Sequence, residues 1–209
     1  MARREPPSAK SGTFRLNKID VAEAHIVSAV KLFFENGHPV SVCLLASAAR
    51  EILTTLGDKT GVKTLLHDMS SWRGEPLKET INKAHGFAKF FKHANSDTTA
   101  ILEFPEDEVD GILFIACHDF GRITGGMPVH AQVYELFFLA QSYKHVSKLS
   151  MRKQRIARNI IKAFPGVRSA ARLEKKRIGL AVLEKALTDP GLQMEINREI
   201  KLALEEVRP

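Results

Sequence analysis

One predicted helix carries the densest group of side chains that could do chemistry. The group lies on an otherwise apolar stretch and consists of Asn82, His85, Lys89, Lys92, His93, Asn95 and Asp97. Helical residues three or four apart share a face, so part of the set lies together, and Asp97 is close enough in sequence to orient His93. A histidine oriented by a carboxylate beside lysines can transfer protons or bind phosphate. The candidate catalytic residues are therefore His85, Lys92, His93 and Asp97.

The same residues have a purely structural alternative. Lysine and histidine near the C-terminal end of a helix interact favourably with its dipole, and asparagine and aspartate are common in the turn that follows. The sequence leaves both interpretations open.

A second candidate lies at residues 117–123, where CHDFGRI contains the dipeptide His118-Asp119. This segment is similar to the His-Asp pair of HD-domain phosphohydrolases, in which the pair binds a metal ion. The resemblance implies a metal-ligand set of His85, His118 and Asp119, with Asp189 as a further member, and such ligands suit a transition metal that activates water. Short motifs also arise by chance, as His67-Asp68 illustrates, and Asp189 falls in an expected Asp-Pro-Gly turn. The metal site is an alternative, and we expect no cofactor.

The third candidate is a concentration of positive charge between Lys144 and Arg177. This segment has twelve cationic residues and one acidic residue, a net charge of +11, so the rest of the chain carries −4 within the total of +7. A neutral-to-acidic body with a basic arm is typical of a protein that binds a polyanion. A single basic helix is also often an ordinary solvated surface.

The sequence SMRKQRIARNIIKAF in this arm predicts an amphipathic helix. An apolar stripe is expected to pack inward and consists of Ile156, Ile160, Ile161 and Phe164. The cations spread over the other faces are the candidate nucleic-acid-binding residues: Arg152, Lys153, Arg155, Arg158 and Lys162. Such a helix would bind phosphates in a salt-dependent manner with little sequence preference.

The elements that position these candidates are all predicted helices. Asn17, with Asp20 three residues later, opens a helix that stops at Gly37, and Pro39 opens a second helix that stops at Gly57. The two are expected to form an antiparallel hairpin. Further helices are expected over about 76–95, from FPEDEVD to Gly125-Gly126, and from MPVHAQVYELFFLA. The only short extended candidate is ILEF at 101–104.

The pattern therefore predicts an all-α protein, a bundle of about six helices with a basic C-terminal helical extension. We expect a disordered basic tail at 1–14, the helical bundle at 15–143 and the basic extension at 144–209. The extension is expected to break at Phe164-Pro165-Gly166 and at Asp189-Pro190-Gly191. The Phe-rich stretch 134–138 could be core or the interface of a homo-oligomer.

The two cysteines, Cys43 and Cys117, each lie in an apolar run, where a reduced cysteine behaves as a small core hydrophobe. No run approaches the roughly 20 apolar residues of a membrane helix, and the first residues lack the apolar region of a signal peptide. We therefore expect a cytoplasmic protein with no membrane span.

Residues from about 17 to 140 resemble a family of uncharacterised bacterial helical proteins. Its signature is Phe-Phe-Lys-His-Ala followed shortly by Asp, which this chain has at residues 90–94 and at Asp97. The segments PVSVCLLASAAREIL, LEF and ITGG are also similar to that family. The resemblance implies no established activity.

The hairpin with its alanine-rich second helix is also distantly similar to HEPN helical domains, many of which cut or bind RNA. Active members carry an arginine, four to six further residues and then a histidine. This chain departs from that pattern near His93, because Lys89 is too close and His85 too far. The resemblance implies RNA binding, or a degenerate ribonuclease that relies on His93.

The leading functional hypothesis is a helical binding protein whose basic arm engages RNA, DNA or an acidic protein. The alternatives are an HD-type metal-dependent phosphohydrolase and a degenerate HEPN-like ribonuclease. The sequence does not decide between an enzyme and a binding protein.

Overall fold

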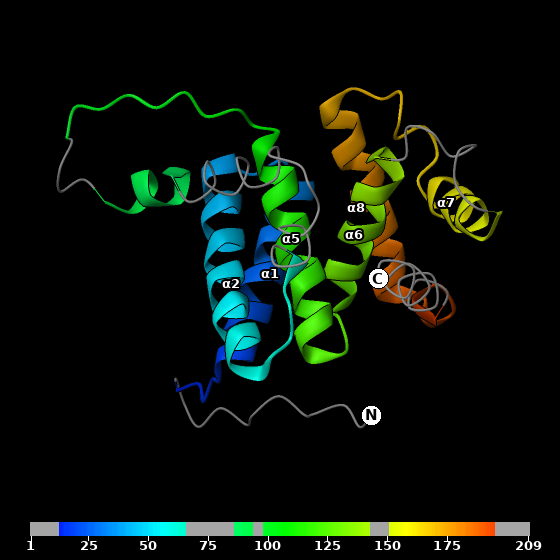
Figure 1. Ribbon diagram of the computed structural model, residues 1–209. Helices are drawn as coiled ribbons and strands as arrows, with labels where there is room; N and C mark the ends of the chain where they lie inside the picture. Colours follow the sequence, from blue (N-terminus) through cyan, green and yellow to red (C-terminus); the bar gives the residue numbers. More distant parts are fainter. Residues whose placement is uncertain (1–12, 66–85, 94–97, 143–150, 195–209) are drawn as a thin grey trace.

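The computed structural model describes residues 13–65, 86–93, 98–142 and 151–194, and helices dominate these ranges (Figure 1). They include α1 (Lys18–Phe34), α2 (Pro39–Thr60), α5 (Glu108–Thr124), α6 (Val129–Ser142), α7 (Met151–Ala163) and α8 (Arg172–Thr188). The described ranges contain no β-strand, and ILEF at 101–104 is irregular. The all-α class is confirmed, and the expected number of about six helices before residue 143 is matched only roughly.

The first two helices form the expected antiparallel hairpin, seen in blue and cyan in Figure 1. Asn17 Oδ1 accepts the backbone N–H groups of Ile19 and Asp20 at 2.8 and 3.0 Å, and Asp20 Oδ2 accepts the N–H of Asn17 at 2.9 Å. This reciprocal capping box confirms the predicted start of α1. Pro39 occupies the first turn of α2, as predicted, because that position needs no backbone donor.

The predicted end of α2 at Gly57 is wrong by one turn. The helix continues to Thr60 and ends at Gly61, which adopts a left-handed conformation with φ of 71° and donates its N–H to the carbonyl of Gly57. Gly57 is buried because the chain folds back over it, and a Cβ at this position would lie 2.7 Å from the carbonyl oxygen of Val62. The glycine is needed for close approach, whereas Gly61 supplies the backbone conformation that ends the helix.

Aromatic rings from α1 and α6 fill the centre of the bundle. The rings of Phe33 and Tyr134 lie 5.1 Å apart edge to face, and those of Phe34 and Phe137 lie at the same distance. The buried Tyr134 hydroxyl donates to the carbonyl of Asp110 on α5 at 3.1 Å. Tyr134 and Phe137, in the Phe-rich stretch 134–138, are therefore core residues.

The helices after residue 150 share this core. Four residues of α7 and the turn after it are buried in the same apolar cluster: Ile156, Ile160, Phe164 and Val167. The Phe164 ring lies 5.8 Å from that of Phe137. The predicted inward stripe of α7 is confirmed, with Ile161 only half-buried. The boundary expected near residue 144 lies outside the described residues.

The two predicted breaks in the basic region are also found. Gly166, with φ of 79°, follows the end of α7 at Ala163. After α8 ends at Thr188, Asp189 Oδ1 accepts the N–H groups of Gly191 and Leu192 at 2.9 and 3.1 Å. In α8, Gly179 packs so closely on the Phe34 ring of α1 that a Cβ there would overlap the ring.

Among the described residues, α2 is the one helix long and apolar enough to cross a membrane by length and composition. Its most apolar window has a mean hydropathy of 1.4, and 44% of that window is buried inside the bundle. A core helix passes the same test, so this is weak evidence for a membrane span.

Candidate functional site

The cationic surface lies on α7, at the edge of the molecule in Figure 1. The inner face of α7 buries Ile156, Ala157 and Ile160, so the basic side chains on its other faces point outward. Of the five sequence-predicted binding residues, Arg155, Arg158 and Lys162 are exposed in the structure. Arg158 donates a hydrogen bond to Gln154 Oε1 at 2.9 Å. The side chains of Arg152 and Lys153 lie outside the described part of α7.

Two other cations of the basic segment hold α8 onto the bundle. Arg172 donates two hydrogen bonds to the carboxylate of Asp110, at 3.0 and 2.8 Å, and its Nε lies 2.9 Å from Glu106 Oε1. Lys176 is buried and donates to Glu106 Oε1 at 2.6 Å and to Asn36 Oδ1 at 2.9 Å. The Phe33 ring lies beneath both cations, 5.7 Å from Arg172 Cζ and 5.1 Å from Lys176 Nζ.

The pKa values in this network follow from the competition between burial and pairing. The hydrogen bonds from Lys176 and Arg172 lower the pKa of Glu106. Burial raises the pKa of Asp110, and the bond from Arg172 offsets this only in part. Burial opposes the charge of Arg172, but its bonds to Asp110 and Glu106 outweigh burial and raise its pKa. Arg172 and Lys176 therefore stabilise the packing of α8. The cationic surface available to a ligand is smaller than the net charge of residues 144–177 suggests.

The exposed cations of the described basic segment therefore concentrate on α7 and the turn after it. Arg168 in that turn is exposed, like the three cations of α7. On α8, Arg177 lies 3.5 Å from Glu174 in an exposed ion pair. The surface most able to meet a polyanion consists of Arg155, Arg158, Lys162 and Arg168, which we call the α7 cationic face.

His118, one residue of the predicted metal pair, points into the bundle. Its Nδ1 lies 2.9 Å from Glu135 Oε1 of α6, and only 4% and 2% of the two side chains are exposed. The imidazole also stacks on Phe114, with the ring centroids 5.7 Å apart. This pair ties α5 to α6 inside the core.

Asp119 is completely buried and serves a different contact. Its Oδ1 accepts the backbone N–H of Leu65 at 2.6 Å, whereas Oδ2 has no hydrogen-bond partner among the residues that the structure describes. Burial raises the pKa of Asp119 to about 6. The hydrogen bond from Leu65 opposes this rise, as do electrostatic interactions with His118, Arg122 and Arg50. Burial lowers the pKa of Arg50, itself almost fully buried on α2.

The predicted metal site gains no support from the described residues. These ranges contain no group of three or more histidine, cysteine, aspartate or glutamate side chains that could hold a metal ion. His85 lies outside the described residues, and the side chain of Asp189 caps the start of the helical segment 190–194 that follows α8. The set of His85, His118 and Asp119 stays a prediction.

The polar set of the predicted fourth helix is described only in part. Residues 86–92 are helical, and the exposed Lys92 and His93 mark the end of this segment. Lys92 Nζ lies 3.7 Å from Glu51 Oε1 on α2, and the N–H of His93 donates to the carbonyl of Lys89 at 3.1 Å. These contacts are those of a helix end. His85 and Asp97 lie outside the described ranges, so the catalytic hypothesis stays a prediction.

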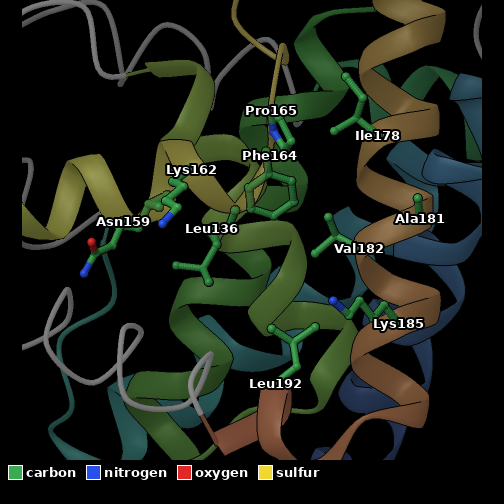
Figure 2. Close-up of a pocket in the computed structure, with 12 residues that line it drawn as sticks. Leu136, Asn159, Lys162, Phe164, Pro165, Ile178, Ala181, Val182, Lys185 and Leu192 are labelled. Carbon is green, nitrogen blue, oxygen red and sulfur yellow. The ribbon is translucent and has the colours of Figure 1, made fainter.

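A pocket of about 750 Å³ lies beside the α7 cationic face, between α6, α7, α8 and the helical segment 190–194 (Figure 2). Apolar side chains form most of its wall, and Lys162 and Lys185 approach it from opposite helices. Its lining consists of Leu136, Asn159, Ile160, Lys162, Ala163, Phe164, Pro165, Ile178, Ala181, Val182, Lys185 and Leu192.

Neither the pocket nor the contacts of Lys176 with Glu106 and of His118 with Glu135 could be predicted from the sequence. One signal was available, because Glu106 and Asp110 lie four residues apart, as do Arg172 and Lys176. Arg172 and Lys176 share a face of α8, whereas Glu106 lies in the turn before α5 and Asp110 in its first turn. Spacing along the chain does not say which other element such a face meets. Glu135, the partner of His118, was not among the candidate residues.

A comparison of the chain with protein-family models finds no match. Comparisons with curated proteins and with solved structures also find none.

Proposed function

We propose that this protein binds nucleic acid through the α7 cationic face, by contacts to the phosphate backbone. One observation carries the proposal: α7 buries its apolar side in the bundle core, and the opposite side presents cations to solvent. Neither Arg155 nor Lys162 makes an ion pair with another described residue. A helix anchored in this way presents its charges on a fixed scaffold, which favours binding to a regular array of phosphates.

The expected binding is electrostatic and weakly sequence-specific. Each phosphate neutralised on duplex DNA contributes about −0.9 to the slope of log affinity against log salt concentration. The three cations on α7 itself, Arg155, Arg158 and Lys162, would thus contribute about −3 to this slope, and Arg168 would add about −1. The described part of α7 offers no aromatic side chain for base stacking, which favours recognition of charge and shape.

A salt-titrated binding assay tests the proposal, with the full-length protein against duplex DNA and mixed-sequence RNA. The variant Arg155→Ala/Arg158→Ala is expected to reduce the slope by about 2 and to weaken binding at low salt. The control variant Lys18→Ala/Lys63→Ala loses the same charge at exposed positions outside the arm. Absence of binding to both nucleic acids at low salt, or equal loss in the two variants, would contradict the proposal.

The enzyme hypotheses have no comparable support among the described residues. His118 and Asp119 are buried and engaged by Glu135 and Leu65. Metal analysis of the purified protein, with phosphatase assays in added manganese, tests the HD-type alternative. Unchanged RNA cleavage by a His93→Ala variant would exclude the ribonuclease role of His93.

A cytoplasmic location belongs to the same proposal. Both cysteines are free and buried, which suits a reducing compartment. Such a compartment also contains the nucleic acids that the α7 cationic face would bind.

A further inference from the structure

The pocket beside α7 combines two features that no contact within the described residues explains. Its wall is largely apolar, with Leu136, Phe164, Val182 and Leu192 arranged around the space in Figure 2. Its volume of about 750 Å³ falls in the range of about 300–1,000 Å³ that is typical of small-molecule sites. The space is therefore suited to an apolar chain of limited length.

The charged side chains among the described lining residues of the pocket are both cationic. Lys162 approaches from α7 and Lys185 from α8, and Figure 2 shows them on opposite sides of the apolar wall. The lining residues that the structure describes include no aspartate or glutamate. Both lysines are exposed, and neither makes an ion pair with a residue that the structure describes. An occupant with an anionic group would complement these two ammonium groups.

We propose that this pocket binds a single-chain amphiphile with an anionic head, of which a fatty acid is the simplest example. The chain lies against the apolar wall, where each buried methylene contributes favourably. The head lies at the rim, near Lys162 and Lys185, where it keeps contact with water. The pocket lining includes Lys162 of the α7 cationic face but neither Arg155 nor Arg158, and its occupant has an apolar chain, so this inference goes beyond nucleic-acid binding.

The first experiment measures the affinity of the full-length protein for a series of probes below their micelle concentrations. Octanoate, decanoate and dodecanoate are expected to bind one per chain, with affinity rising about fourfold for each added methylene that fits the pocket. Dodecanol, which has the same chain without the charge, is expected to bind about fivefold more weakly than dodecanoate. Absence of dodecanoate binding, or equal affinity for dodecanoate, dodecanol and dodecyltrimethylammonium, would overturn the proposal.

The second experiment reverses the charge at the rim. The variant Lys162→Glu/Lys185→Glu is expected to bind dodecyltrimethylammonium in preference to dodecanoate, because the exposed substitutions leave the apolar wall unchanged. The control Lys18→Glu/Lys63→Glu has the same net charge and is expected to keep the wild-type preference. If both variants change preference equally, overall charge explains the binding and the pocket does not.

The third experiment fills the space and separates the two proposals. Ala181→Trp, at an exposed position in the pocket lining, is expected to reduce dodecanoate affinity at least tenfold and to leave nucleic-acid binding unchanged. The Arg155→Ala/Arg158→Ala variant is expected to weaken nucleic-acid binding and to leave dodecanoate affinity unchanged. Undiminished dodecanoate binding by the folded Ala181→Trp variant, or association only with vesicles of anionic lipid, would overturn the pocket proposal.

Discussion

The buried carboxyl of Asp119 gives the sharpest prediction about stability. Burial raises its pKa from the ordinary 3.8 to about 6. Between these two values the folded protein binds more protons than the unfolded chain, so the free energy of unfolding falls as pH rises. The loss of stability that comes from ionising the buried Asp119 is absent below about pH 4 and complete above about pH 6. It reaches about 3 kcal/mol, since one pH unit corresponds to about 1.4 kcal/mol.

The Asp119→Asn variant removes the ionisable group and keeps an oxygen that can accept the N–H of Leu65. The free energy of unfolding is measured by urea denaturation, followed by circular dichroism, at several pH values from 4 to 8. The variant is expected to gain up to about 3 kcal/mol relative to the wild type between pH 4 and pH 7. The other titrating groups are common to both proteins, so their contributions cancel in the difference.

Asp119→Ala serves as the matched comparison, because it removes the charge and the acceptor together. It leaves the Leu65 N–H buried without its partner, which costs about 1–3 kcal/mol at every pH. The two variants should therefore share the pH-dependent step and differ by a constant offset. A flat difference between Asp119→Asn and wild type across pH 4–7 would refute the reasoning. A relative loss of variant stability with rising pH would instead mean that ionised Asp119 stabilises the fold through Arg50 and Arg122.

Three further predictions concern the docking of α8 and the buried thiols. Gly179→Ala places a Cβ against the Phe34 ring and should lower the urea-measured free energy of unfolding by about 1–3 kcal/mol. Gly86→Ala, whose Cβ would meet no described residue within 4 Å, should not lower it. Arg172→Lys keeps the charge but loses the two bonds to Asp110; a cost of about 1–2 kcal/mol is expected in the same assay, and an unchanged value would contradict the role of the paired bonds. Burial raises the pKa values of the Cys43 and Cys117 thiols, so a thiol-reactive dye should label both cysteines only after denaturation; rapid labelling of the native protein would show that the core opens readily.

The local structure of this protein could be predicted from short stretches of sequence. The capping box at Asn17, the start of α2 at Pro39 and the end of α5 at Gly125 depend on residues within one or two helical turns. The inward stripe of α7 follows from the period of the helix alone. Gly57 was misjudged because its role depends on a carbonyl that returns from beyond the end of the helix.

The candidate sites depended on contacts that join distant parts of the chain. The sequence located the cations of the basic segment, but Arg172 and Lys176 carry the same charge as Arg155 and Arg158 and serve a different purpose. Only the packing of α8 against Glu106 and Asp110 separates the structural cations from the exposed ones. The His118-Asp119 pair was a candidate for metal binding from its sequence, and the contacts of its members with Glu135 and Leu65 could be found only in the fold.

The sequence by itself determined the helices, their caps and the excess of positive charge, because these properties depend on neighbouring residues and on composition. The tertiary structure decided which charges are buried, which remain on the surface and where the apolar pocket lies. Those outcomes depend on how helices separated by tens of residues approach one another, through contacts such as Gly179 with Phe34 and Lys176 with Asn36. Helical periodicity predicts which face of a helix is apolar, but only the packing of the helices determines what that face contacts.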